Sequence, residues 1–369
     1  MKHILVTGAY GFIGRNLALA LGRDPDIETI SVDIDTPKEE LSRGLETCDV
    51  VFHLAGINRP SGEGEFETGN VGSLATALSG LELRQRRPLV VLSSSAQVLL
   101  DNPYGRSKRR AEELLFDYCR RTGSAACVFR LPGVFGKWCR PNYNSVVATF
   151  CHNIARDIPI QISVPSRGIE IVHVDDVVST FLGLLAKKHE GAIFSDIAPV
   201  FKIKLGELAE KLYKFRKSRE DLRVADLSDP FLRRLFGTYM SYLPPDGFAH
   251  DLEQKADVRG ALAEILKANG HGQFFVSRTK PGIVRGNHYH DIKVEKFLVL
   301  EGEALIRFRS MATGDKAEYP VSGYELKAVD IPPGWTHSIQ NVGNSEMIVL
   351  FWASEVFDAD RPDTYPAEV

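Results

Sequence analysis

The sequence predicts an α/β fold, a doubly wound and mostly parallel sheet, followed by a smaller all-β jelly-roll barrel. From residue 1 to about 185, short β-branched runs alternate with helical stretches, which is the pattern of βαβ units. After about residue 250, short alternating strands are separated by Gly and Pro turns. A chain of 369 residues with 44% apolar residues is long enough for two cores, so we expect two domains, 1–243 and 244–369.

The elements are expected in the following order. Strands of the parallel sheet are predicted at Ile4–Thr7, Thr29–Asp33, Val50–Leu54, Leu89–Ser94 and Ala126–Leu131. A charged amphipathic helix is predicted from Leu205 to Phe236, and Pro244–Gly247 marks a turn-rich joint. Barrel strands include Gln273–Ser277 and Ala304–Phe308.

Composition narrows the class of partner. With 45 basic and 48 acidic residues the net charge is −3, which favours a small-molecule partner over nucleic acid or an anionic membrane. The N-terminus lacks the pattern of a signal peptide, and no stretch is long and apolar enough for a membrane span. The five cysteines show no CxxC spacing. We therefore expect reduced thiols and a cytoplasmic protein.

A glycine-rich turn follows the first predicted strand. Gly8, Gly11 and Gly14 form GxxGxxG before a helix, where backbone amides can approach a pyrophosphate. Asp33 ends the second strand, where a carboxylate accepts the ribose hydroxyls and repels a 2′-phosphate. The pattern indicates a Rossmann-type dinucleotide site and locally favours NAD(H), although Asp33 could also be a solvated strand end.

A Tyr-Lys pair follows the fourth strand. Tyr104 and Lys108 are one helical turn apart, so a lysine ammonium beside the phenol is expected to lower the pKa of Tyr104. Tyr104 would then protonate the alkoxide formed when a ketone is reduced, while Ser95 donates a hydrogen bond to it. Ser95, Tyr104 and Lys108 are the predicted catalytic residues.

Residues 1–243 resemble the extended short-chain dehydrogenase/reductases, a family of sugar-nucleotide epimerases, dehydratases and reductases. The motifs that carry the resemblance are Gly8–Gly14, His53–Gly56, Ser93–Ser95, Tyr104 with Lys108, Leu131–Gly133 and His173–Asp176. The predicted cofactor-binding set is Gly8, Gly11, Phe12, Ile13, Gly14, Asp33, Leu54, Ala55, Gly56, Ser93, Tyr104 and Lys108. The resemblance also implies a nucleotide-sugar substrate, for which Asn142, Asn144, Arg156 and Arg167 are candidate contacts, each of which could equally be a surface polar residue.

Three histidines and a glutamate have the spacing of a metal site. His288 and His290 are two apart on a strand and share a face, Glu295 follows, and His337 comes from a later strand. This set suits one divalent metal, and we expect Zn²⁺. The pattern resembles the cupin family motif, with a longer interval between Gly323 and His337 than that motif has.

The whole chain resembles the CapF-type enzymes of bacterial capsule and O-antigen synthesis. Long runs carry this resemblance, among them Leu54–Pro60, Asp101–Gly105, Phe135–Ser145 and Arg361–Tyr365. It implies a homodimer that acts towards UDP-N-acetyl-L-fucosamine. The cupin would epimerise C3 of a UDP-4-keto-6-deoxy-N-acetyl-hexose, and the reductase would reduce C4 to UDP-2-acetamido-2,6-dideoxy-L-talose. The C–H is acidic only while the ketone exists, so epimerisation would come first.

Several alternatives remain open at this point. The family implies NADPH whereas Asp33 favours NADH, so the cofactor is NADP(H) or NAD(H). The cupin could be a structural or dimerisation module beside a reductase, the whole chain could be a dinucleotide-binding redox sensor, or the metal could be the iron of a dioxygenase. Tyr289, Lys293 and Lys296 lie near the metal motif as candidate epimerisation bases or as plain surface residues.

Overall fold

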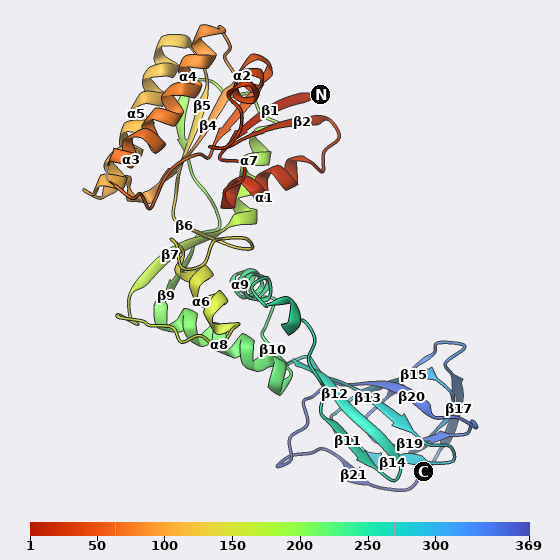
Figure 1. Cartoon of the computed structure of the whole chain (residues 1–369). Coiled ribbons are helices and arrows are strands. Elements are labelled where there is room, and N and C mark those ends of the chain that lie inside the picture. Colours follow the sequence, from red (N-terminus) through yellow and green to blue (C-terminus); the bar gives the residue numbers. More distant parts are fainter. Residues whose placement is uncertain (63, 269) are drawn as a thin grey trace. The chain divides into compact units, whose positions relative to one another are not determined.

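The computed structural model describes residues 1–62, 64–268 and 270–369, and the chain forms two compact units (Figure 1). The first comprises Met1–Leu212 with Arg234–Leu243, and the second comprises Tyr213–Arg233 with Pro244–Val369. None of the helices in these described residues is long and apolar enough to cross a bilayer. All five cysteines are free and buried.

The first unit is built on a six-stranded parallel sheet with the order β2-β1-β3-β4-β5-β8. Its strands are β1 (Lys2–Thr7), β2 (Ile27–Val32), β3 (Val50–His53), β4 (Leu89–Ser95), β5 (Ala126–Leu131) and β8 (Ala192–Ser195). Each of the five predicted strands is present, and β8 adds an edge strand that was not predicted. The order reverses at β1, which makes the carboxyl ends of β1 and β3 the expected ligand crevice. The predicted doubly wound fold is confirmed.

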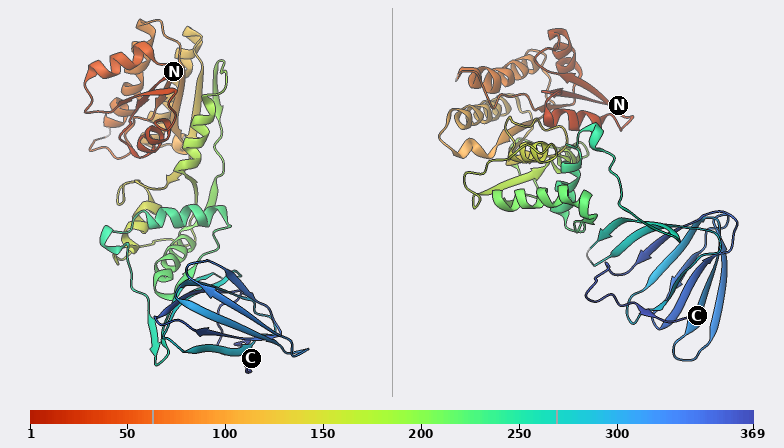
Figure 2. Two further views of the ribbon diagram at one scale, coloured as in Figure 1. Left: turned by 90° about the vertical axis from the view of Figure 1, so that its right-hand side faces the viewer. Right: turned by 60° about the horizontal axis from the view of Figure 1, so that its bottom comes forward.

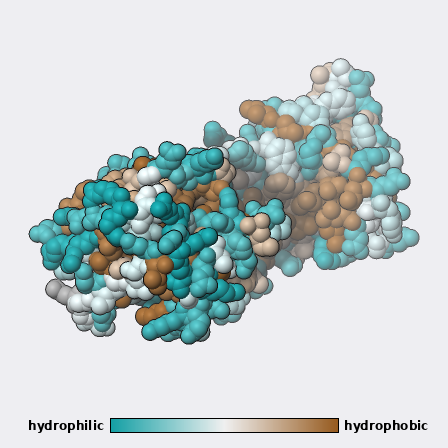
Figure 3. Space-filling view, turned by 90° about the horizontal axis from the view of Figure 1, so that it is seen from above, coloured by the Kyte–Doolittle hydropathy of each residue, from teal (hydrophilic) through white to brown (hydrophobic). Residues whose placement is uncertain are grey.

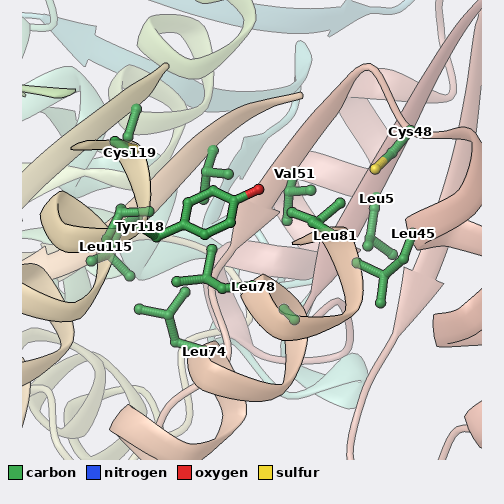
Figure 4. Packing of buried hydrophobic residues seen from close by; sticks show 14 of the residues in the cluster. Leu5, Leu45, Cys48, Val51, Leu74, Leu78, Leu81, Leu115, Tyr118 and Cys119 are labelled. Carbon is green, nitrogen blue, oxygen red and sulfur yellow. The ribbon is translucent and has the colours of Figure 1, made fainter. Parts of the chain in front are cut away.

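Helices cover both faces of this sheet. One face carries α2 (Lys38–Thr47), α4 (Ser73–Leu83) and α5 (Pro103–Thr122), and the other carries α1 (Phe12–Leu21) and α7 (Val174–Leu184). Strand side chains alternate between the two cores, since Leu5 packs with the first layer while Ile4 and Val6 pack with the second. Figure 4 shows Leu5 in the first core with leucines of α4 and Tyr118 of α5. Burial of each such leucine contributes about 2 kcal/mol.

A smaller sheet, β6-β7-β9, belongs to the same unit. Its strands are β6 (Gly133–Phe135), β7 (Gly168–His173) and β9 (Phe201–Lys204). The unit's remaining helices are α3 (Gly64–Phe66), the π-helix η1 (Glu67–Gly72), the 3-10 helix η2 (Ala96–Leu99), α6 (Val146–Ile154), and parts of α8 (Leu205–Asp221) and α9 (Pro230–Met240).

The predicted single helix from Leu205 to Phe236 is wrong, because α8 and α9 are separate. Leu222 has a φ of 61°, which ends α8, and the short strand β10 (Arg223–Val224) follows. Asp229 then accepts backbone N–H bonds from Phe231 and Leu232, and this cap starts a new helix with proline at its first position.

In the second unit the strands wrap into a barrel of two sheets (Figure 2). One sheet has the order β10-β12-β13-β20-β15-β18 with β11 on β12, and the other has the order β17-β16-β19-β14-β21. The strands are β11 (Gln254–Asp257), β12 (Gly260–Ala268), β13 (Gly272–Thr279), β14 (Val284–Tyr289), β15 (Glu295–Glu301), β16 (Glu303–Ser310), β17 (Lys316–Ser322), β18 (Ala328–Ile331), β19 (Trp335–Asn341), β20 (Met347–Ala353) and β21 (Tyr365–Pro366).

The barrel core lies between these two sheets and is closed by Phe297, Ile306 and Val349 among others. The joint predicted at Pro244–Gly247 contains a short 3-10 helix, η3 (Pro245–Gly247). In the described residues beyond Gly247 the regular elements are all strands. The predicted all-β barrel is therefore confirmed.

Candidate functional site

The glycine-rich turn lies between β1 and α1 and is too tightly packed for side chains. A Cβ on Gly8, whose φ is 69°, would lie 2.6 Å from the backbone nitrogen of Ala55. A Cβ on Gly14 would lie 2.1 Å from the carbonyl oxygen of Gly8. The chain turns at Gly11, and α1 begins with Phe12. The first-turn amides of α1 are thus presented at the sheet edge, as an anion site requires.

Asp33 follows β2 and reaches the same turn. Its Oδ2 accepts the backbone N–H of Tyr10 at 2.9 Å, and its Oδ1 accepts that of Ile34 at 2.9 Å. Each carboxylate oxygen keeps further acceptor capacity, so both predicted roles, ribose contact and exclusion of a 2′-phosphate, are chemically available.

Ser93, Ser95, Tyr104 and Lys108 come together where β4 ends and α5 begins. Lys108 is buried and donates from Nζ to the carbonyl oxygen of Ser93 at 3.2 Å. The Ser95 hydroxyl accepts the N–H of Gln97 at 3.2 Å and also hydrogen-bonds the Tyr104 side chain. The structure therefore assembles the predicted catalytic residues in one place, and their catalytic role stays a prediction.

The pKa values at this place differ from the expectation for Tyr104. Burial raises the pKa of Tyr104, and its hydrogen bond with Ser95 opposes the rise only in part. Burial also lowers the pKa of Lys108 to about 8, although Glu112 opposes this. The expected lowering of the pKa of Tyr104 by Lys108 is thus wrong, because desolvation is the largest effect. Tyr104 holds its proton at neutral pH, which a proton donor needs.

Asn70 is a buried residue of this site that was not predicted from the sequence. It lies in η1, and its Nδ2 donates to the carbonyl oxygen of Ile57 at 3.0 Å and to the Ser107 hydroxyl at 2.9 Å. Its Oδ1 accepts the N–H of Ile57 at 2.9 Å. Asn70 thus links Ile57, next to the predicted cofactor residue Gly56, to Ser107 of α5. Lys108 is close to the same loop, because a Cβ on Gly56 would lie 3.0 Å from Lys108 Nζ. Asn70 lies in a π-helical turn, and such turns are rare and occur frequently at functional sites.

A cavity of about 540 Å³ lies in the first unit beside the smaller sheet. The predicted substrate contacts Asn144 and Arg167 line it, together with Gln97 and Glu170, which were not predicted. Its full lining is Gln97, Gly133, Val134, Asn144, Ser145, Val146, Val147, Arg167, Gly168, Ile169, Glu170, Ile171 and Leu205. Its size is that of a small-molecule site.

Asn142 and Arg156 are not among these lining residues. Asn142 has a φ of 54° and donates its backbone N–H to Thr149 Oγ1. Arg156 donates from Nη1 to the carbonyl oxygens of Tyr242 at 2.8 Å and His152 at 3.3 Å. Arg156 therefore has a structural bond where the sequence suggested a ligand contact.

The four predicted metal ligands converge in the second unit. One ligand atom each from His288, His290, Glu295 and His337 lies within 4.8 Å of the others. Glu295 Oε2 is 3.4 Å from both His290 Nε2 and His337 Nε2. Metal-ligand distances of about 2.0–2.1 Å in a tetrahedral site imply ligand-ligand distances of about 3.3 Å. The separations thus fit a zinc-sized ion.

A bulge in β14 creates part of this geometry. Gly286 pairs with Ser338, but His288 pairs with His337, so Asn287 is an additional residue, with a φ of 60°. Asparagine tolerates this conformation better than most residues. The bulge brings His288 opposite His337, and their ring centroids are 4.6 Å apart.

The chemistry of the donor set also fits a cation. Burial alone would raise the pKa of Glu295, but His290 and His337 lower it to about 2. Burial, with His337 nearby, lowers the pKa of His288 to about 4. Among the described residues, His290 Nε2 and both ring nitrogens of His337 are buried without a hydrogen-bond partner. A carboxylate beside imidazole nitrogens that are buried without hydrogen-bond partners is the donor set of a divalent metal.

The three candidate bases have interaction partners other than the four ligands. Tyr289 alternates with the ligands along β14, and its ring is 5.3 Å from that of Tyr365. Lys293 donates from Nζ to Pro362 O and Thr364 Oγ1, and Lys296 pairs with Asp330. Each of these side chains already has a partner outside the four ligand residues.

Comparisons with known proteins cover both units. Residues 4–197 match the NAD dependent epimerase/dehydratase family, and residues 255–365 match the polysaccharide biosynthesis C-terminal domain. The chain is 44% identical over 366 residues to the UDP-2-acetamido-2,6-beta-L-arabino-hexul-4-ose reductase of Pseudomonas aeruginosa, across 99% of this chain and 98% of that protein.

Solved structures match over the whole length as well. The capsular polysaccharide assembling protein CapF from Staphylococcus aureus is 42% identical with a TM-score of 0.91, covering 99% of this chain and 100% of that one. A structure of CapF with the inhibitor 3-isopropenyl-tropolone is 38% identical with a TM-score of 0.88, covering 100% of both chains.

Proposed function

The chain belongs to the NAD dependent epimerase/dehydratase family in its CapF-type form, and from this premise we propose that it catalyses two consecutive steps on a UDP-sugar. The barrel epimerises C3 of a UDP-4-keto-6-deoxy-N-acetyl-hexose, and the first unit reduces the C4 ketone to UDP-2-acetamido-2,6-dideoxy-L-talose with NADH or NADPH. The observation that carries the proposal is the full-length similarity to a named UDP-sugar reductase, joined to the cluster of Ser95, Tyr104 and Lys108.

In the first unit the side chains supply the proton and the orientation. When bound, reduced nicotinamide supplies hydride and a divalent metal polarises a ketone. Tyr104, protonated at neutral pH, donates its proton to the C4 oxygen, and the Ser95 hydroxyl hydrogen-bonds that oxygen. The Lys108 ammonium, held by the Ser93 carbonyl, stabilises the negative charge that then develops on Tyr104. Arg167 and Asn144 are the candidate contacts to the diphosphate and the sugar in the adjoining cavity.

In the barrel, His288, His290, Glu295 and His337 would hold the metal. The inhibitor named for the CapF complex is a tropolone, a class of molecule whose adjacent oxygens chelate divalent cations. Proton removal at C3 also needs a base, and the three candidate side chains have other partners. This observation favours a second candidate function, a reductase whose barrel metal is structural.

Incubation with the UDP-4-keto sugar in D₂O, without reduced cofactor, separates the two candidates. Epimerisation predicts deuterium at C3 by NMR, its loss after chelation of the metal, and its return when Zn²⁺ is restored. Addition of NADH or NADPH then yields the reduced sugar. Metal-loaded protein that reduces C4 but introduces no deuterium at C3 would support the reductase alone. Heat-inactivated protein controls for spontaneous exchange.

A homodimer formed through the barrel is part of the proposal. The outer face of the sheet β13-β20-β15 carries neighbouring apolar side chains, with Phe274 opposite Trp352 and Leu350 opposite Leu298. Phe274 is 39% exposed, and Figure 3 shows hydrophobic residues gathered on part of the fainter barrel unit. Apolar surface of this kind marks association sites. Light scattering at micromolar concentration checks the expected dimer mass.

A further inference from the structure

The segment Pro362–Ala367 lies against the strands that carry the metal ligands. Its strand β21 pairs antiparallel with β14, with Pro366 opposite His288 and Tyr365 opposite Tyr289. The N–H of Ala367 donates to the carbonyl oxygen of Asn287 at 3.0 Å. Residues more than seventy positions apart in the chain are thus joined at the ligand cluster.

One contact of this segment reaches a ligand directly. The Nδ1 of His290 lies 2.5 Å from the backbone carbonyl oxygen of Asp363. A carbonyl only accepts hydrogen bonds, so Nδ1 carries the proton, and in the neutral imidazole the lone pair is then on Nε2. Nε2 is the atom 3.4 Å from Glu295 Oε2 and has no hydrogen-bond partner. The contact therefore selects the tautomer that a metal ligand requires.

The Asp363 side chain fixes the position of its own carbonyl. Its Oδ1 accepts the N–H of Asp291 at 2.9 Å, and its Oδ2 accepts those of Ile292 at 3.1 Å and Lys293 at 2.7 Å. Lys293 Nζ donates to Pro362 O at 2.8 Å and to Thr364 Oγ1 at 3.0 Å on either side. Asp363 has a φ of 37°, a conformation that these bonds maintain.

We propose that Asp363 is a positioning residue of the metal centre. Its carboxylate clamps the 362–367 segment onto the 291–293 turn, so that its carbonyl holds His290 with Nδ1 protonated and Nε2 directed to the metal. The inference rests on the proposed metal site and adds to it a residue outside the ligand motif. A purely structural role for the segment would stabilise the barrel without changing metal affinity.

Asp363→Asn is the test variant. Asparagine tolerates a positive φ but replaces one carboxylate oxygen by an NH₂ group, which cannot accept the backbone N–H bonds at the position that it takes, either that of Asp291 or those of Ile292 and Lys293. Asp360→Asn, an exposed position three residues away, removes the same charge and serves as the matched control. Thr364→Val removes a Lys293 partner and is a milder second variant.

Two readouts decide the proposal in the full chain. Zinc affinity, measured by competition with a chromogenic chelator, is expected to fall about 10–100-fold in Asp363→Asn, and to change less than about twofold in Asp360→Asn. Thr364→Val is expected to fall in between. Nitrogen-15 NMR of the metal-free protein is expected to show His290 as the Nδ1–H tautomer in wild type, with a mixture of tautomers in Asp363→Asn.

The outcomes separate this inference from the proposed function. Unchanged zinc affinity in Asp363→Asn, or an unchanged tautomer, overturns the positioning role even if the variant is less stable. A wild-type protein that binds no zinc overturns the metal centre itself and this inference with it. Zinc binding that depends on Asp363, without deuterium exchange at C3, leaves the positioning role intact and removes the epimerase proposal.

Discussion

The reductase site and the barrel site differ in how their polar atoms are satisfied. Lys108 and Ser95 already have protein partners in Ser93 and Gln97. His337 and His290 have buried ring nitrogens without hydrogen-bond partners among the described residues. Buried polar atoms without partners are costly, and a cation bound at the proposed metal site would offset this cost. The polar atoms of the first site are thus bonded within the protein, whereas those of the second would be satisfied by the cation that we propose.

The largest expected effect is on a variant that should lose C4 reduction and keep exchange at C3, because the two sites lie in different units. Tyr104→Phe removes the proton donor and is expected to slow C4 reduction about 10³-fold. Deuterium exchange at C3 should stay within about twofold of wild type, because the barrel ligands are untouched. NADH or NADPH oxidation and NMR of the keto sugar measure the two rates. Equal loss of both would show that the sites do not act separately.

A pH profile sharpens the same comparison. Burial lowers the pKa of Lys108 to about 8, so this lysine loses its proton as the pH rises through that value. The reduction rate is expected to be flat near neutral pH and to fall towards tenfold per pH unit above about pH 8. Exchange at C3 does not use Lys108 and should not fall with the same midpoint. A reduction rate that stays constant to about pH 10 would contradict the role of Lys108.

The smallest expected effect lies within the first unit and compares two arginines. Arg167 lines the cavity, and Arg167→Ala is expected to raise KM about tenfold through loss of a charge-assisted hydrogen bond. Arg156 is bonded to the Tyr242 carbonyl, so Arg156→Ala should leave KM unchanged and lower the free energy of unfolding by about 1 kcal/mol. Steady-state kinetics and urea unfolding measure both. A raised KM in Arg156→Ala would instead support the prediction from the sequence that Arg156 contacts the substrate.

Local spacing explains what could be predicted from the sequence. Gly8 to Gly14, Tyr104 with Lys108, and His288 with His290 are each set by one turn, one helix or one strand, so residue spacing nearly determines their geometry. The parallel sheet and the barrel follow from hydrophobic periodicity in the same way.

Long-range contacts explain what could not be predicted. Asn70 bonds Ser107 on another helix, Arg156 bonds Tyr242, and Asp363 bonds His290, and none of these pairings has a spacing signal. The raised pKa of Tyr104 has the same origin, since burial is a property of the folded chain. These residues show where tertiary packing decides between a ligand contact and a structural bond.

The bulge at Asn287 has a consequence for the tolerance of this protein to insertions and deletions. Side chains alternate across a strand with a period of two, and the additional residue resets that parity between Gly286 and His288. A deletion of one residue there would retain all four ligand residues in the sequence while bringing a different residue opposite His337. Substitution patterns in relatives would not reveal such a loss, whereas strand length would. The spacing from Gly282 to His288 is therefore as much a part of the proposed metal site as the histidines themselves.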